Sequence, residues 1–253
     1  MILSGFLAES FQDWDKGLSS VVFTGKCNFR CPACYASKLL CSDTAFTEEE
    51  IHKKISRKAV YIKNIVICGG EATLESGLED FIRTLKNKGL SVKLDTNGSN
   101  PEVLKKLIDE KLIDHIAMDI KGPEYLYNRI SGLTPDKSAE NISKKVAQSL
   151  KIIHNAISYE LRTTIVPVLR KGDEYSWLTP EECTDMTQWA YNLLNGQAPL
   201  WFLQRFTART AAEMIDPKLS KENLPSSYWE TPDDLLASIK DKASELNYIF
   251  KIR

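Results

Sequence analysis

Residues 20–35 read SVVFTGKCNFRCPACY and place three cysteines, Cys27, Cys31 and Cys34, directly after a short apolar run. The run SVVFT is rich in β-branched residues and is typical of a buried parallel strand. The whole chain has six cysteines, so half of them lie on this one loop. Parallel barrels carry their active sites at the carboxyl ends of their strands, and we therefore expect the chemistry of the protein at this end.

Further apolar runs along the chain predict more strands of the same kind. They lie at residues 64–68, 91–94, 115–120, 160–168 and 200–203. Helical stretches lie between them, and several begin with a recognisable signal. These signals are Thr47 with Glu50, Thr179 with Glu182, and Asn100 with Pro101. Strands that alternate with helices predict right-handed βαβ crossovers and a parallel sheet covered by helices.

The alternation of strands and helices defines the fold class as α/β, and the number of strands indicates the kind of barrel. Six parallel strands, where a closed barrel has eight, predict an open-sided partial (β/α)6 barrel with its helices outside. Near the end, Thr231 with Asp234 starts another helical stretch, and the closing run IFKIR can add a strand. We therefore expect one domain over 1–253, with a core at about 18–206 and a C-terminal helix and strand extension at about 207–253.

Composition excludes several classes of protein. The chain has 253 residues, is 43% hydrophobic and carries a formal net charge of −1 from 33 basic and 34 acidic residues. This balance gives no electrostatic reason for binding nucleic acid or a membrane surface. No secretory leader and no apolar stretch of about 18 residues occurs, which predicts a cytoplasmic protein.

The spacing of the three cysteines favours an iron–sulfur cluster over zinc. A structural zinc site needs four ligands, and the remaining cysteines, Cys41 and the two others at 68 and 183, form no second pair. We interpret these three as packed thiols. A four-iron, four-sulfur cluster ordinarily takes four thiolates, so three thiolates leave one iron open for a substrate or cofactor. The three histidines are dispersed and predict neither a catalytic triad nor a zinc site.

Polar residues follow the other predicted strands where each one ends. Because these ends meet at one edge of a parallel sheet, we expect the side chains to face the cysteine loop. They could supply acceptors for an ammonium, a cation for a carboxylate and partners for a ribose, which together describe a nucleoside that bears an amino acid. The residues are Gly69, Gly70, Glu71, Asp95, Thr96, Asn97, Asp119, Lys121, Arg162, Gln204 and Arg205.

The cysteine spacing together with Gly69-Gly70-Glu71 resembles that of radical S-adenosylmethionine (SAM) enzymes. Most of the chain is similar to activating enzymes of glycyl-radical proteins, nearest to the group called anaerobic ribonucleoside-triphosphate reductase activating protein. The segments that carry this resemblance are SGFLAESFQDW, VVFTGKCNFRCPACY, ICGGEAT, VKLDTNGSNPEVL, IAMDIKGP and WFLQRF.

The resemblance implies a role for each matching residue. Cys27, Cys31 and Cys34 would ligate a 4Fe–4S cluster, and SAM would bind the open iron. Gly69, Gly70 and Glu71 would receive the ammonium of SAM. The candidates for its carboxylate or adenosyl side are Lys121 and Arg162, those for ribose or methionyl contacts are Asn97 and Asp119, and those for a monovalent cation are Asp95, Thr96 and Asp119.

Two positions depart from the family pattern. Ala33 stands where an aromatic residue usually precedes the third cysteine, and Ala72 replaces the proline common after the glutamate. Tyr35 is a candidate for the missing contact to adenine.

The implied activity is reductive cleavage of SAM and abstraction of hydrogen from a glycine of a partner enzyme. The resemblance indicates anaerobic (class III) ribonucleotide reductase as that partner and a low-potential donor such as flavodoxin or ferredoxin. An open-sided barrel would admit a glycine-bearing loop. We expect the partner to dock on residues 170–178 and 206–230.

Two alternatives stay open. One is a radical SAM enzyme that acts on a small molecule such as a deazapurine-pathway intermediate. The other is a noncatalytic iron–sulfur carrier or metal-stabilised binding module. The polar strand ends argue against the carrier, because an electron carrier gains nothing from an open iron.

Overall fold

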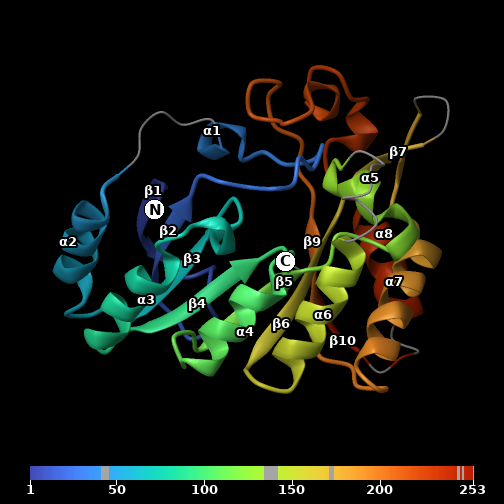
Figure 1. Cartoon of the computed structure of the whole chain (residues 1–253). Coiled ribbons are helices and arrows are strands. Elements are labelled where there is room, and N and C mark those ends of the chain that lie inside the picture. Colours follow the sequence, from blue (N-terminus) through green and yellow to red (C-terminus); the bar gives the residue numbers. More distant parts are fainter. Residues whose placement is uncertain (41–45, 134–141, 171–173, 244–245, 247, 253) are drawn as a thin grey trace. The chain divides into compact units, whose positions relative to one another are not determined.

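The computed structural model describes the chain except for residues 41–45, 134–141, 171–173, 244–245, 247 and 253 (Figure 1). Its strands are β1 (Leu3–Ser10), β2 (Ser19–Thr24), β3 (Asn64–Gly69), β4 (Ser91–Thr96), β5 (His115–Asp119), β6 (Tyr159–Ile165), β7 (Pro167–Leu169), β8 (Tyr175–Trp177), β9 (Leu200–Arg205) and β10 (Ile249–Ile252). Its helices are α1 (Ser37–Leu40), α2 (Glu48–Lys58), α3 (Leu78–Asn87), α4 (Pro101–Asp109), α5 (Tyr127–Ser131), α6 (Ile142–His154), α7 (Pro180–Leu193) and α8 (Asp233–Ala243).

The larger sheet has the strand order β1-β2-β3-β4-β5-β6-β9-β10. Strand β3 pairs in parallel with β2 and β4, and β9 pairs in parallel with β6 and β10. The predicted α/β class with a mostly parallel sheet is thus confirmed, and all the predicted parallel strands are present in sequence order. The closing run adds β10 beside β9.

Two features of the sheet differ from the expectation. The single predicted strand at 160–168 ends at Ile165, and β7 pairs antiparallel with β8 in a separate sheet. Pro167 has no N–H to donate, which explains why the ladder stops there. At the other end of the order, β1 pairs antiparallel with β2 and was not predicted.

The described chain forms two compact units that each collect several segments. Unit 1 consists of 1–28, 38–117 and 152–159, and unit 2 of 29–37, 118–151 and 160–253. Strands β5 and β6 contribute residues to both. The segment after 207 belongs to the same unit as β6 and β9, and this division differs from the expected core and extension, which stays a prediction.

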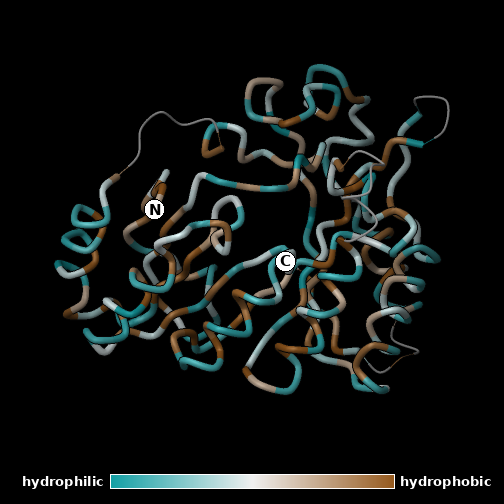
Figure 2. Tube along the Cα trace, viewed as in Figure 1, coloured by the Kyte–Doolittle hydropathy of each residue, from teal (hydrophilic) through white to brown (hydrophobic). Residues whose placement is uncertain are grey.

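In unit 1 the strands β2, β3 and β4 are largely buried and helices cover them. Residues 65–67 of β3 are fully buried in succession, as expected of a strand with both faces covered. Thr47 and Glu50 form the predicted capping box of α2, which buries Ile51 and Ile55. Figure 2 shows hydrophobic and hydrophilic stretches alternating along this helix, which fits one buried and one exposed face.

In unit 2 the core is built around β9 and α7. Trp201 of β9 is fully buried, and its ring packs edge-on to Tyr248. Helix α7 starts at the predicted capping box of Thr179 and Glu182 and buries Cys183. Within the described residues of both units, no helix is long and apolar enough to cross a membrane.

Candidate active site

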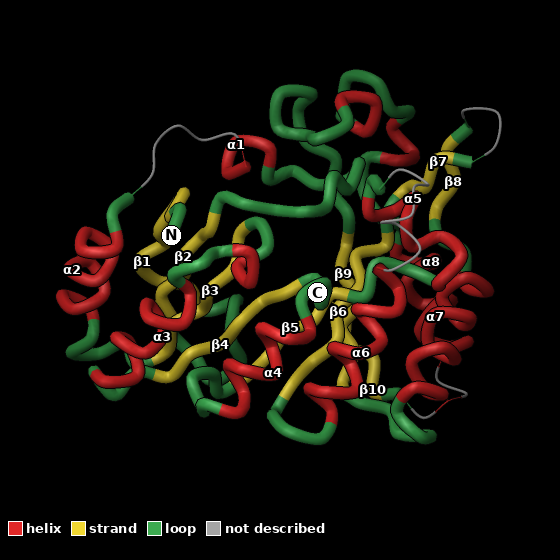
Figure 3. The backbone as a smooth tube through the Cα atoms, in the orientation of Figure 1, coloured by secondary structure: helices red, strands yellow, loops and turns green. Residues whose placement is uncertain are grey.

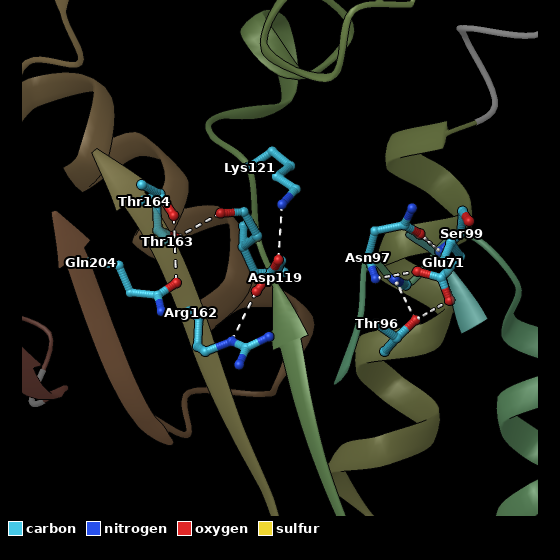
Figure 4. A network of polar contacts seen from close by, with 12 residues as sticks. Glu71, Thr96, Asn97, Ser99, Asp119, Lys121, Arg162, Thr163, Thr164 and Gln204 are labelled. Atoms are coloured by element: carbon cyan, nitrogen blue, oxygen red, sulfur yellow. Dashed lines mark hydrogen bonds and ion pairs between the residues drawn. The ribbon is translucent and has the colours of Figure 1, made fainter. Parts of the chain in front are cut away.

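The polar strand ends fall in both units. Figure 4 shows the side chains that carry the two hydrogen-bonded groups. Unit 1 contributes Cys27 and the turns after β3 and β4. Unit 2 contributes Cys31, Cys34 and the ends of β5, β6 and β9.

The turn after β3 needs glycine because it lies against the chain's own backbone. Gly69 has a φ of 113°, and a Cβ on it would lie 2.5 Å from the backbone of Thr24. A Cβ on Gly70 would lie 2.0 Å from the carbonyl oxygen of Lys26. The amide of Glu71 donates to that same oxygen at 2.6 Å. The glycines therefore allow close approach to the segment that leads into Cys27.

Glu71 joins this turn to the turn after β4. Its side chain is fully buried and accepts hydrogen bonds from the Asn97 amide at 2.6 Å and the Thr96 hydroxyl at 2.8 Å. The hydroxyl and amide of Thr73 donate to it at 2.5 and 3.2 Å. Burial raises the pKa of the carboxyl against the opposing effect of these donors. The predicted contact of Glu71 with an ammonium stays a prediction, since its carboxylate already has these partners.

Asn97 extends the same network to the cysteine loop. Its Nδ2 donates to Oδ1 of Asn28 at 3.1 Å, and its Oδ1 accepts from the Ser99 amide at 2.9 Å. Asn28, which follows Cys27 directly, donates to the Ser99 hydroxyl at 2.9 Å. Asn28 and Ser99 were not predicted. The position of Asn28 inside the cysteine motif was the one available signal.

The predicted monovalent-cation residues have other partners in the structure. Asp95 lies 3.8 Å from the ammonium of the buried Lys93, which opposes a second cation there. The Thr96 hydroxyl donates to Glu71. Among the described residues, no group of three or more His, Cys, Asp and Glu side chains could hold a metal ion. A 4Fe–4S cluster takes one thiolate at each of its irons, so its cysteines need not converge on one point.

In unit 2, Asp119 lies between two cations. Lys121 Nζ is 2.9 Å from Oδ2 of Asp119, and Arg162 Nε is 3.0 Å from Oδ1 (Figure 4). Burial alone would raise the pKa of Asp119, but the charges of Lys121 and Arg162 outweigh it and lower the pKa to about 2. One carboxylate thus faces two cations, so the trio carries a net positive charge that suits the carboxylate of an amino acid.

Buried hydroxyls fix the strands that carry this trio. Thr163 donates to the Ile120 carbonyl at 2.7 Å and accepts from Nε1 of Trp201 at 3.0 Å. Thr164 and Gln204 lie 3.4 Å apart on neighbouring strands. Arg205 instead pairs with Asp233 at the start of α8. The end of β9 therefore contributes Gln204 to the group, and Arg205 to a structural ion pair.

The cysteines lie on a stretch that is mostly loop between β2 and α1 (Figure 3). All three are partly buried. The Cys34 amide donates to the Cys31 carbonyl at 3.0 Å, which forms a turn, and the Ala36 amide donates to Sγ of Cys34 at 3.4 Å. An amide directed at sulfur is the kind of partner that a thiolate ligand of a cluster takes. The donor set therefore fits the cluster.

The Tyr35 side chain is 61% exposed, and the guanidinium of Arg209 lies 5.6 Å from its ring. Cys183 is buried and Cys68 packs beside a small apolar cluster, as expected of packed thiols. Cys41 lies outside the described residues.

Comparison with known proteins assigns the family. The model of the Radical SAM superfamily matches residues 21–179, and the chain belongs to this superfamily. Membership implies a 4Fe–4S cluster and SAM as cofactors. The chain is 36% identical over 169 residues to the protein named "Putative glycyl-radical enzyme activating enzyme MJ1227" of Methanocaldococcus jannaschii, covering 66% of this chain and 69% of that protein.

Two further proteins broaden the comparison. The chain is 35% identical over 92 residues to the 7-carboxy-7-deazaguanine synthase of Neisseria meningitidis, covering 36% of this chain and 41% of that enzyme. A radical SAM methyltransferase from Sphaerobacter thermophilus has the same fold, with a TM-score of 0.64 at 12% identity, covering 95% of this chain and 67% of that one.

Proposed function

We propose that the protein is a glycyl-radical activating enzyme that uses a 4Fe–4S cluster and SAM. The observation that carries this proposal is the 36% identity over two thirds of a protein that bears the name of such an enzyme. The cysteine loop and the polar strand ends of both units support it, because each supplies groups that the cofactors need. When bound, the cluster and SAM supply the one-electron chemistry that removes a hydrogen atom from a glycine of the partner.

The residues of this chain have distinct tasks in the proposal. Cys27, Cys31 and Cys34 hold the cluster. Lys121 and Arg162 attract the carboxylate of SAM, and Asp119 holds the two cations in place and faces the ribose or methionyl side.

In unit 1, the turn after β3 is the proposed partner of the ammonium of SAM. Gly69 brings its backbone close to Thr24, Gly70 brings its backbone close to Lys26, and Glu71 fixes this turn against Asn97. The backbone and carboxylate of Glu71 would face the ammonium. Tyr35 contacts adenine in place of the aromatic residue that usually stands at the position of Ala33. Asp95, Thr96 and Asp119 would contact a monovalent cation, with which the ammonium of Lys93, 3.8 Å from Asp95, would compete.

We further propose anaerobic ribonucleotide reductase as the partner, with flavodoxin or ferredoxin as the electron donor and the cytoplasm as the location. The docking surface comprises the described parts of 170–178 and 206–230. Within unit 2 these two segments contact each other, since Trp177 stacks on Tyr228 with ring centroids 5.4 Å apart, and the Tyr228 hydroxyl donates to the Tyr175 carbonyl. Exchanging both segments should abolish binding of the partner, and retained binding would contradict this surface.

The second candidate is a radical SAM enzyme for a small molecule. The 35% identity to a deazaguanine synthase favours it, but over only 92 residues. The two candidates differ in product. Anaerobically reconstituted protein, reduced with SAM and mixed with a candidate reductase, should give a glycyl doublet in electron paramagnetic resonance (EPR). A modified deazapurine precursor without a doublet would favour the second candidate.

A further inference from the structure

The cysteine loop of unit 2 obtains its geometry from distant segments. The Arg30 amide donates to the Ser131 carbonyl at 2.9 Å, where α5 ends. On the other side of the loop, the Asp216 amide donates to the Pro32 carbonyl at 3.2 Å. Residues 25–36, between β2 and α1, form no helix or strand, so these bonds replace secondary structure as the constraint on the cysteines.

Residues 212–216 hold the stretch after the third cysteine at both of its ends. The Ile215 amide donates to the Cys34 carbonyl at 2.8 Å. Three residues later, the Ser37 hydroxyl lies 2.9 Å from the Glu213 carbonyl oxygen and 3.2 Å from that of Ala212. One short segment therefore fixes both Cys34 and Ser37.

The residue between these two fixed points carries the contact that matters for a cluster. The Ala36 amide donates to Sγ of Cys34 at 3.4 Å. Its direction depends on the path of the chain from Cys34 to Ser37. If the Ser37 anchor were lost, this stretch could turn and move the amide away from the sulfur.

A hydrogen bond to a cysteine sulfur alters the reduction potential of the cluster that the sulfur ligates. Reduction adds negative charge, and an amide dipole directed at the sulfur stabilises that charge. We infer that Ser37 is a positioning residue that raises the reduction potential of the cluster by holding the Ala36 amide on Cys34. The inference rests on the proposed role of Cys34 as a cluster ligand and goes beyond it by assigning a tuning role to a residue that binds neither iron nor SAM.

The test compares Ser37→Ala with a matched control in the same region. Asn223→Ala removes side-chain contacts to the Pro217 carbonyl and the Ser220 hydroxyl and leaves the Ser37 hydroxyl and its acceptors unchanged. Both variants and Ser37→Thr are reconstituted anaerobically. Their midpoint potentials are then measured by EPR-monitored titration without SAM or partner.

The expected result is a lower potential for Ser37→Ala alone. Loss of one hydrogen bond to the sulfur should shift the one-electron equilibrium about threefold toward the oxidised cluster, which is about 30 mV at 59 mV per tenfold change. Ser37→Thr keeps the hydroxyl and should restore the wild-type potential. An unchanged potential in Ser37→Ala with full iron content, or an equal shift in Asn223→Ala, would overturn the inference.

A second measurement needs no variant. Hydrogen exchange of the Ala36 amide, followed by mass spectrometry in the wild-type holoprotein, must be slowed by its bond to sulfur. Exchange as fast as in an unstructured peptide would overturn the inference even if Ser37→Ala does not retain iron. Because neither measurement uses a partner, the glycyl doublet of the wild type decides the proposed function separately.

Discussion

The hydroxyl of Ser37 lies 2.9 Å from the carbonyl oxygen of Glu213, a residue 176 positions further along the chain. Segments that are distant in sequence thus determine where the cysteines lie. Changes far from the cysteine motif should therefore affect iron binding.

Gly132→Ala is expected to impair cluster binding. Gly132 ends α5 with a φ of 66°, and a Cβ there would lie 1.8 Å from the Arg30 carbonyl oxygen. The backbone of the cysteine loop would have to move, and the left-handed conformation alone costs about 1–2 kcal/mol. Iron content after anaerobic reconstitution should fall several-fold. Gly89→Ala is the control, because its φ of 71° is similar but no atom lies within 4 Å of its Cβ position. Equal iron content in the two variants would contradict this prediction.

Glu71→Gln is expected to destabilise unit 1. The buried carboxylate accepts from Asn97, Thr96 and Thr73, and a glutamine would direct an NH2 group at some of these donors. An unsatisfied buried donor costs about 1–3 kcal/mol. The free energy of unfolding, measured by urea denaturation, should fall by an amount of this size. The exposed Glu49→Gln should stay within about 0.5 kcal/mol of wild type, and a similarly small effect at Glu71 would show that the network contributes little.

Asp119 predicts a dependence of stability on acid pH. Its pKa falls from the ordinary value of 3.8 to about 2 in the folded protein, so its stabilising effect is complete above pH 4. That contribution is lost as the pH falls from about 4 to about 2, where the carboxylate becomes protonated in the fold. Asp119→Asn should lower the free energy of unfolding by about 2 kcal/mol at neutral pH. The free energy of unfolding of this variant should also depend less on pH between about 4 and about 2.

The matching control for Asp119 is Asp109→Asn, since Asp109 forms an exposed pair with Lys105. Its effect should be near zero, as is usual for surface pairs. If the two variants had the same pH profile, the ion pairs of Asp119 would not be responsible.

Cys183 should be inert to alkylation while the folded apoprotein is labelled at the cysteine loop. Burial raises the pKa of the Cys183 thiol to about 12, so almost no thiolate exists at pH 8. Iodoacetamide followed by peptide mass spectrometry should modify Cys27, Cys31 and Cys34 first. Rapid modification of Cys183 in the folded protein would contradict its buried position.

Sequence patterns predicted a strand or a helix start correctly where the residues that cause it are neighbours in the sequence. In the run NIVIC at 64–68, the three central residues 65–67 are all apolar because both faces of the strand are buried there, and such runs predicted their strands. Thr47 with Glu50 predicted a capping box because both partners lie within one turn. In contrast, β1 mixes buried and partly exposed residues without a regular period, and it was missed.

The candidate site could be predicted only in part, for a similar reason. The identity of Glu71 indicated a carboxylate near the cysteine loop, but its partners come from the turns at 73 and 96–97. Ser37 was missed because its acceptors are backbone carbonyls, which any residue supplies and which leave no trace in the sequence. Gly70 was assigned to the ammonium of SAM, whereas the structure shows that a Cβ there would lie 2.0 Å from the Lys26 carbonyl oxygen, a neighbour that the sequence did not indicate.

The most direct test of the proposed function is the EPR spectrum of the reconstituted protein, reduced with SAM and mixed with a candidate anaerobic ribonucleotide reductase. We predict a glycyl doublet that is absent when Cys31→Ala replaces the wild type. If 5′-deoxyadenosine forms with no doublet on any candidate glycyl-radical protein, the activase proposal is contradicted. If neither product appears although the cluster is intact and reduced and SAM is bound, the radical chemistry assigned to this site is contradicted as well.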